Sequence, residues 1–159
     1  MYLIETEIEI AASPERVWSI LMDFPAYPEW NPFIRSLSGV AKPGEKLRAI
    51  IQPEERRTMT FRPRLLKVAN QQELRWLGRL GFPGLFDGQH YFQLAALSNG
   101  YTRFTQGEQF SGILVGIFIS SMEAATKAGF NAMNQALKNR AEANDHMGHV
   151  HDDISKEWY

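Results

Sequence analysis

The hydrophobic pattern changes its period at Gly112, and no other feature of the chain constrains the fold as strongly. After Gly112, apolar and small residues recur at steps of three or four, which is the spacing of one helical face. The members of this stripe are Leu114, Phe118, Met122, Ala125, Gly129, Met133 and Ala136. The pattern predicts a final helix of about 30 residues, or about 45 Å at 1.5 Å per residue.

Before Gly112 the chain is dominated by predicted strands. Apolar and acidic residues alternate over residues 2–10, as they do in a half-buried strand. Short segments rich in turn-forming or charged residues then separate six further predicted strands. These are 34–41, 45–52, 58–69, 72–79, 86–97 and 101–111. Consecutive strands joined by short turns favour an antiparallel meander.

A short helical region follows the first strand. Ser13 is predicted to cap a helix whose first position is Pro14. Pro25 and Pro28 are expected to end this helix. The segment FPAYPEWNPFI, residues 24–34, comes next and is too interrupted by proline to continue it. Its aromatic residues are Phe24, Tyr27, Trp30 and Phe33.

These elements predict an α+β fold. A curved antiparallel sheet of about seven strands needs a cover for its apolar face, and the final helix is the element large enough to provide it. A curved sheet around one helix tends to leave a hollow, and the small residue Gly129 on the stripe favours this. With 159 residues, the chain is expected to form one domain over 1–144, followed by a polar tail over 145–159.

Charge and composition narrow the partners. Seventeen basic and eighteen acidic residues give a formal net charge of -1, so no basic field is expected to hold nucleic acid or anionic lipid. The most hydrophobic run, residues 112–122, is too short to span a bilayer, which needs about 20 residues. We therefore expect neither nucleic-acid binding nor stable membrane insertion.

The absence of cysteine excludes several chemistries. A chain without cysteine has no disulfide scaffold, thiolate zinc site or cysteine nucleophile. The first residues, MYLIETEIEI, lack the basic start and apolar centre of a signal peptide. No nucleophile elbow or glycine-rich phosphate loop is present. We expect a cytoplasmic protein without a cofactor.

Three segments together carry a family resemblance. They are FPAYPEWNPFI at 24–34, LRWLGRLGFPGLFDGQHYF at 74–92 and TRFTQGEQFSGIL at 102–114, the last followed by the long helix. With the order of elements, they resemble the SRPBCC or START-like helix-grip superfamily, and most closely its polyketide cyclase/dehydrase-like branch. The resemblance covers residues 3 to 140.

The resemblance implies an apolar internal cavity that opens at one end. In relatives, the segment that corresponds to 24–34 lies near the mouth of the cavity, with Trp30 packed under the sheet. Phe24 and Tyr27 are then the candidates for a gate. The superfamily includes lipid carriers, hormone receptors, cyclases and activators of chaperone ATPases, so the resemblance is more specific for fold than for function.

The last two strands give the sharpest prediction about a site. If Ser98, Asn99 and Gly100 form a three-residue hairpin loop with Gly100 in a left-handed conformation, Leu97 pairs with Tyr101. His90 then lies opposite Glu108, with Cβ atoms about 5 Å apart. The same register places four further apolar residues on one face, and Gln106 with them. These residues are Phe92, Leu94, Phe104 and Phe110.

An imidazole and a carboxylate in an apolar pocket form a plausible acid–base couple. Alternatively, His90 and Glu108 satisfy each other or bind one polar group of a ligand. Trp76 is expected on the same inward face. Arg48 either points inward and anchors a carboxylate, or is solvated while its neighbours point inward.

We predict that the protein binds a small hydrophobic, lipid-, polyketide- or isoprenoid-like molecule between sheet and helix, as a monomer or homodimer. The first alternative is a cyclase or dehydratase that uses His90 and Glu108. The second is a protein-interaction module similar to activators of chaperone ATPases. The candidate ligand-binding residues are Phe24, Tyr27, Trp30, Phe33, Trp76, Phe86, His90, Phe92, Phe104, Gln106, Glu108, Phe110, Phe118, Met122 and Gly129.

The tail contains His146, His149, His151 and Asp152, which are residue types that can bind zinc or nickel. A catalytic metal needs fixed geometry and supporting hydrogen bonds, and neither is evident here. We therefore expect no functional metal site.

Overall fold

The computed structural model describes residues 1–53 and 56–143. Eight strands and four helical segments follow one another within these two ranges. They are β1 (Tyr2–Ile10), α1 (Pro14–Met22), η1 (Phe24–Ala26), α2 (Tyr27–Trp30), β2 (Ile34–Ser38), β3 (Arg48–Ile51), β4 (Met59–Phe61), β5 (Arg64–Ala69), β6 (Glu73–Leu80), β7 (Phe86–Ala96), β8 (Thr102–Ser111) and α3 (Val115–Ala143).

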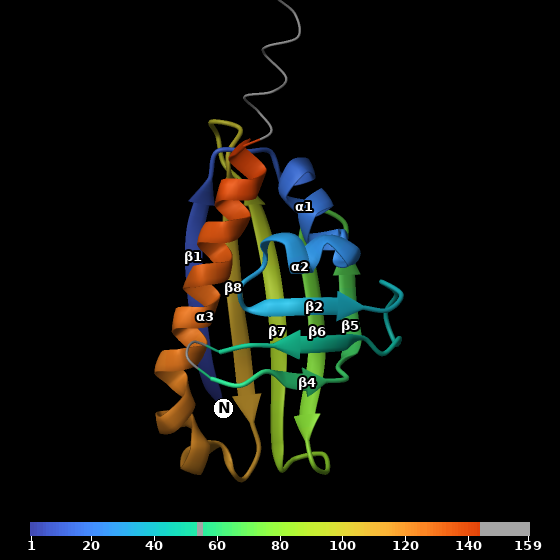
Figure 1. The fold of residues 1–159 in the computed structure, drawn as a ribbon, viewed down its shortest axis with the longest axis vertical. Helices are drawn as coiled ribbons and strands as arrows, with labels where there is room; N and C mark the ends of the chain where they lie inside the picture. Colours follow the sequence, from blue (N-terminus) through green and yellow to red (C-terminus); the bar gives the residue numbers. More distant parts are fainter. Residues whose placement is uncertain (54–55, 144–159) are drawn as a thin grey trace, which may run out of the picture.

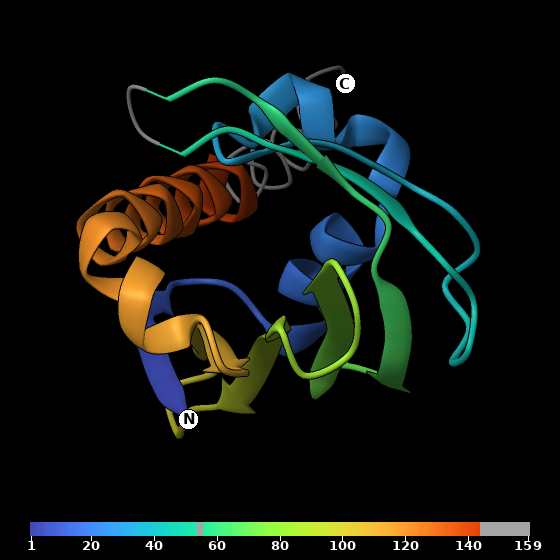
Figure 2. The same ribbon diagram turned by 90° about the horizontal axis from the view of Figure 1, so that it is seen from below.

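The strands form two antiparallel sheets. The larger has the order β1-β8-β7-β6-β5, and the smaller has the order β2-β3-β4 (Figure 1). Seen from below, α3 runs along one side of the space between the sheets and packs against β1 and β8 (Figure 2). Lys46, just before β3, forms an isolated bridge with Arg64 at the start of β5. The two sheets and the helix therefore surround a common interior.

Pro63 divides the strand that the sequence predicts over 58–69. Proline cannot donate a ladder hydrogen bond, so a strand usually ends at one. Here β4 ends at Phe61 and joins the small sheet, whereas β5 begins at Arg64 and joins the large one. The Pro63 carbonyl accepts a hydrogen bond from the Leu47 amide at 2.8 Å. The prediction of one continuous strand is wrong for this reason, and the described part of the chain contains eight strands.

The predicted start of α1 is confirmed. The Ser13 side chain accepts a hydrogen bond from the Arg16 amide at 3.2 Å, and Pro14 is the first helical residue. Residues 24–30 are not an irregular loop, because they form the short helical segments η1 and α2, each with proline in its first turn. Proline is well tolerated there, since the first amides of a helix have no partner within it.

The hairpin between β7 and β8 has the predicted register. Gly100 has a φ of 83°, and the Leu97 amide donates to the Tyr101 carbonyl at 2.9 Å. His90 pairs with Glu108, and Phe92 pairs with Gln106. The loop geometry therefore sets which side chains of these strands face the interior.

The predicted apolar stripe of α3 is only partly correct. Met133 is fully buried, but Phe118 is 47% exposed, and the buried face also includes residues one position away from the stripe. These additional residues are Val115, Thr126, Phe130, Asn134 and Leu137, and Ala141, beyond the end of the stripe, is buried as well. The C-terminal half of α3 contacts both α1, through Arg16 and the Arg140 carbonyl, and β1, through Lys138 and the Glu9 carbonyl, so its buried face is wider than a single stripe.

Candidate functional site

An apolar cavity of about 460 Å³ lies between the two sheets and α3. Strands β6, β7 and β8 form its floor, while β3 and β4 form the opposite wall. Phe118, Met122 and Thr126 line it from α3, and Phe33 lines it from the segment before β2. Pockets of a few hundred Å³ with mainly apolar linings are typical sites for small ligands.

The floor is bare at its centre because two glycines face each other across β6 and β7. Gly78 pairs with Gly88, two residues along each strand from the pair formed by Trp76 and His90. A methyl group on Gly78 would meet only the Gly88 carbonyl oxygen, at 4.0 Å. At Gly88, by contrast, a methyl group would collide with the Glu108 carboxylate. These glycines leave space for the cavity and for the Glu108 side chain respectively.

One end of the cavity is open. Its lining residues at that end are exposed: Leu80 is 50% exposed, Phe118 47% and Met59 44%. Arg56 and Arg79 also line this end. Arg56 donates to the Ser121 carbonyl at 2.7 Å, and the Arg79 Nε lies 3.5 Å from an Asp87 oxygen. The mouth is thus apolar with two guanidinium groups beside it.

His90 and Glu108 lie together at the inner end of the cavity. The Nδ1 atom of His90 is 3.5 Å from Oε2 of Glu108. The His90 side chain is 3% exposed and that of Glu108 22%. The ring of Trp76 stacks on the imidazole with centroids 4.9 Å apart and an interplanar angle of 11°. The sequence prediction that these two groups form an inward pair is confirmed.

A chain of buried polar groups holds the other side of the imidazole. Nε2 of His90 lies 3.1 Å from Oε1 of Gln106, and Nε2 of Gln106 donates to Oδ1 of Asn134 at 2.8 Å. Asn134 in turn donates to the Thr6 hydroxyl at 2.9 Å. Thr6 and Asn134 were not identified from the sequence. The only sequence signal for Asn134 is a polar residue one position after Met133 on the helix.

The structure brings together about half of the predicted ligand-binding residues. Those that line the cavity are Phe33, Trp76, Phe86, His90, Glu108, Phe110, Phe118 and Met122. Phe92 and Phe104 are fully buried on the same sheet but lie in the packed core beyond the inner end of the cavity. Gln106 acts behind the site, through His90.

Phe24 and Tyr27 do not form a gate. Both are buried, and neither lines the cavity. The Tyr27 hydroxyl donates to the Leu21 carbonyl at 2.7 Å, and its ring contacts the edges of Phe24 and Trp30. Trp30 lines a separate groove beside α1 and the end of α3. The helical turns that begin around Pro25 and Pro28 direct these rings into the protein.

Phe33 lines the cavity because of the turn that follows α2. The buried Oδ1 of Asn31 accepts from the amides of Phe33 and Ile34, at 3.0 and 2.8 Å. The Phe33 ring then packs against Gly129, where a methyl group would collide with it. Gly129 therefore accommodates Phe33, and the interpretation of this glycine as part of a hollow is wrong.

The wall formed by β3 and β4 could not be assigned from the sequence. Ala49 and Ile51 line the cavity from β3, and Met59 and Phe61 from β4. Arg48 is exposed, which decides between the two orientations left open by the sequence. Alternation along β3 places Ala49 and Ile51 on one face of the strand, but it does not show which face is the inner one.

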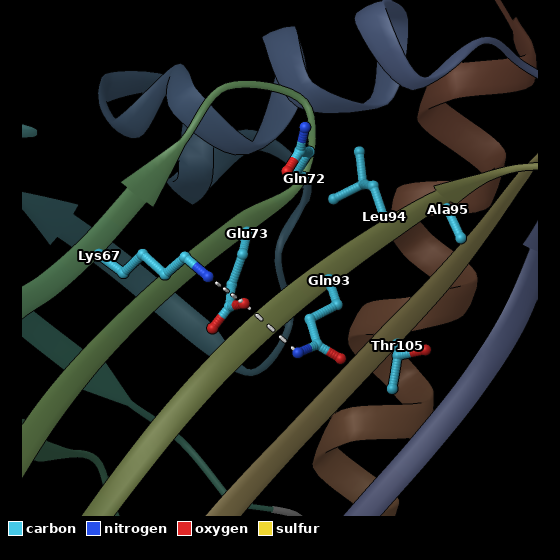
Figure 3. Close-up of a pocket in the computed structure, with 7 residues that line it drawn as sticks. All are labelled: Lys67, Gln72, Glu73, Gln93, Leu94, Ala95 and Thr105. Carbon is cyan, nitrogen blue, oxygen red and sulfur yellow. Dashed lines mark hydrogen bonds and ion pairs between the residues drawn. The ribbon is translucent and has the colours of Figure 1, made fainter.

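The outer face of the large sheet carries a different polar cluster beside a concavity of about 260 Å³ (Figure 3). Glu73 accepts from Arg75 at 2.6 Å and from Lys67 at 3.0 Å. Burial acts to raise the pKa of Glu73, but hydrogen bonds from Arg75 and Lys67 outweigh it and hold the pKa below 4.5. Both oxygens of this carboxylate therefore accept hydrogen bonds from cations within the cluster.

The described residues contain neither a membrane-spanning helix nor a metal-binding cluster. No helix within 1–53 or 56–143 is long and apolar enough to cross a bilayer. In the same ranges, no three His, Asp or Glu side chains are placed to hold a metal ion. The histidine cluster at His146, His149 and His151 lies outside the described residues.

The fold and the cavity define a helix-grip protein, in which a curved antiparallel sheet and a long terminal helix enclose an apolar pocket. The family described as "Polyketide cyclase / dehydrase and lipid transport" matches residues 1–142, so the chain belongs to this family. Membership indicates a role in binding a hydrophobic ligand or in polyketide cyclisation. No curated protein sequence matches the chain.

Solved structures with the same fold have low sequence identity. The chain is similar to the Zhui aromatase/cyclase from Streptomyces sp. R1128, with a TM-score of 0.73, 15% identity and coverage of 91% of this chain and 95% of that one. A START superfamily protein from Mycobacterium smegmatis has a TM-score of 0.69 and 21% identity, with coverage of 90% of this chain and 99% of that one. A norcoclaurine synthase from Thalictrum flavum has a TM-score of 0.68 and 15% identity, with coverage of 91% of this chain and 96% of that one. At these identities the likeness establishes the fold alone.

Proposed function

We propose that this protein binds a small, largely hydrophobic molecule in the cavity between the two sheets and α3. The observation that carries the proposal is the open, apolar cavity with one inward acid–base pair. Burial of apolar surface would supply affinity at about 25 cal/mol per Å². A few polar groups, above all Glu108 and His90, would orient the ligand. A module that only binds proteins would be expected to fill this space with its own side chains.

A solvent-sensitive neutral probe, N-phenyl-1-naphthylamine, tests the proposal. We expect a saturable rise in its fluorescence at one probe per chain. Gly78→Leu should abolish this rise, because the new side chain would occupy the cavity from a position where a Cβ atom meets only the Gly88 carbonyl oxygen, at 4.0 Å. Gly116→Leu is the matched control, since it adds the same side chain to α3 outside the cavity lining. Binding that survives Gly78→Leu in a folded protein would overturn the proposed site.

A second candidate function, a cyclase or dehydratase, is favoured by the position of His90 beside Glu108 within the cavity. One group would remove a proton next to a carbonyl, and the other would protonate an oxygen that leaves. The test is deuterium exchange into the methyl group of 2-acetylnaphthalene, followed by NMR. Catalysis predicts exchange above the buffer rate that is lost in both His90→Ala and Glu108→Gln. If the ligand binds but exchange stays at the buffer rate, only the binding function remains supported.

A further inference from the structure

The directions of the hydrogen bonds behind His90 are fixed by two backbone carbonyls. Nε2 of Gln106 lies 3.4 Å from the Phe130 carbonyl oxygen, and the Thr6 hydroxyl donates to the Gln106 carbonyl oxygen, also at 3.4 Å. A carbonyl oxygen only accepts. The Gln106 amide must therefore present its NH2 group to α3, and Thr6 must accept from Asn134.

This arrangement determines the tautomer of His90. Because the NH2 group of Gln106 faces Asn134 and Phe130, its carbonyl Oε1 faces the imidazole. An acceptor at 3.1 Å from Nε2 requires a proton on Nε2. Nδ1, on the opposite side of the ring, then points to Glu108 without a proton of its own in the neutral imidazole. Thr6, Asn134 and Gln106 are in this sense positioning residues.

The two oxygens of the Glu108 carboxylate have different surroundings. Oε2 lies 3.5 Å from Nδ1 of His90, whereas Oε1 lies over Gly88. A carboxylate oxygen accepts hydrogen bonds, so Oε1 can receive one from a donor on a ligand.

Oε1 of Glu108 lies over the bare backbone of Gly88, on the floor of the cavity. No described residue donates a hydrogen bond to it. Thr126 also lines the cavity. Its hydroxyl can both donate and accept, so it does not discriminate between ligands that donate a hydrogen bond and ligands that accept one. Arg56 and Arg79 belong to the exposed mouth. The inner end of the cavity therefore presents an acceptor that the protein leaves unmatched.

We propose that the cavity selects an apolar ligand whose inner end carries a hydroxyl donor, with phenols and enols favoured over ketones and ethers, because Glu108 Oε1 accepts its hydrogen bond. This inference rests on the proposed function and defines the ligand class. A hydrogen bond to a charged acceptor is stronger than one between neutral groups. An ether or ketone at the same place would leave Oε1 buried without a partner.

Two probes that share one apolar body test the ligand class on the unaltered protein. We expect 2-naphthol to bind at least tenfold more tightly than 2-methoxynaphthalene by isothermal titration calorimetry at neutral pH. The ether is the more hydrophobic probe, so hydrophobic burial alone predicts the opposite order. Equal affinities, or tighter binding of the ether, overturn the inference but leave the proposed function intact. If neither probe binds, the proposed function fails.

Glu108→Leu locates the origin of the preference. This variant should lose the tenfold preference while 2-methoxynaphthalene binds with unchanged or higher affinity. Glu15→Leu, on the exposed side of α1, is the control and should retain the preference. A preference that persists in Glu108→Leu contradicts the assignment to this carboxylate.

The positioning role of Thr6 and Asn134 has its own readout. In long-range ¹H–¹⁵N NMR spectra of ¹⁵N-histidine protein, Nε2 of His90 should carry a proton in every protonation state. Thr6→Val removes the hydroxyl with little change in volume and should allow a second tautomer with the proton on Nδ1. An Nε2 atom of His90 that carries no proton in the unaltered protein overturns the inference. So does a Thr6→Val spectrum that is identical to it in this signal.

Discussion

Both faces of the large sheet carry a cluster of polar side chains, but the two clusters differ in how completely their members are paired. The outer cluster consists of Glu5, Lys67, Glu73, Arg75 and Tyr91, and the inner one of Thr6, His90, Gln106, Glu108 and Asn134. On the outer face, Tyr91 donates to Glu5 and Arg75 lies 4.5 Å from the centre of the Tyr91 ring. Each carboxylate of that cluster accepts a hydrogen bond from a cation or from the Tyr91 hydroxyl, and each cation contacts the Glu73 carboxylate.

The inner cluster is complete on one side only. Its amides and Thr6 satisfy one another, whereas Glu108 has one interaction of 3.5 Å and otherwise faces the cavity. Matched polar groups stabilise a fold, but an unmatched acceptor in an apolar cavity costs free energy unless a ligand completes it. The comparison therefore assigns the outer cluster to stability and the open end of the inner cluster to ligand binding.

The largest expected effect comes from glycines on the two faces. A side chain at Gly107 would collide with the Tyr91 ring that lies across it. We expect Gly107→Val to lower the free energy of unfolding by about 3 kcal/mol, because the ring cannot move without leaving Glu5. Gly78→Val, which points into the cavity, should change it by less than about 0.5 kcal/mol. Urea denaturation measures both, and equal losses would contradict the difference between the faces.

The closed side of the inner cluster should contribute the next largest effect. Gln106→Leu leaves Nε2 of His90 and the Asn134 carbonyl without partners in the core. The expected loss is about 2 kcal/mol of unfolding free energy, the cost of buried unsatisfied groups. Gln109→Leu, on the outward side of the same strand, is the control and should lose far less. Similar losses in the two variants would show that the chain is not a stabilising unit.

Replacing the Glu73 carboxylate and replacing the Glu108 carboxylate should affect the free energy of unfolding differently. We expect Glu73→Leu to lower the free energy of unfolding by about 1 kcal/mol, because Lys67 and Arg75 lose their partner. Glu108→Leu should leave it unchanged or raise it by up to about 1 kcal/mol, as often happens when a binding residue is removed. Thermal unfolding in the absence of ligand tests the pair. A marked loss for Glu108→Leu would make this carboxylate a structural group.

The smallest effect is a dependence of stability on pH. The pKa of Glu73 is lower in the folded protein than its ordinary 4.5. Its contribution is therefore present above pH 4.5 and disappears as the pH falls through the lower folded value. Glu73→Gln should remove part of the acid destabilisation, by less than about 1 kcal/mol given its partial exposure to solvent. An unchanged pH profile would show that the two ion pairs contribute nothing.

The sequence was most informative where local geometry decides the outcome. Gly100 sets a loop whose register brings His90 opposite Glu108, and the alternation of β7 and β8 then sorts their side chains. Likewise, Ser13 and Pro14 define the start of α1 without reference to distant residues. Such features depend on the backbone conformation of a few neighbouring positions.

Features that depend on distant contacts could not be read in the same way. The role of Pro63 as a switch between sheets depends on Leu47, and the role of Gly129 depends on Phe33. The inward position of Asn134 depends on Thr6, which is more than a hundred residues away. Tyr27 is a core residue because Leu21 offers its carbonyl, a fact that aromatic content cannot reveal.

The most direct test of the central claim uses the methionine methyl groups as reporters. Met59 and Met122 line the cavity, whereas Met133 is fully buried in the packed core. In ¹³C-methyl NMR spectra, titration with 2-naphthol should shift the Met59 and Met122 signals together and saturably, while the Met133 signal stays in place. Saturable binding that leaves Met59 and Met122 unchanged would place the ligand elsewhere and contradict the account.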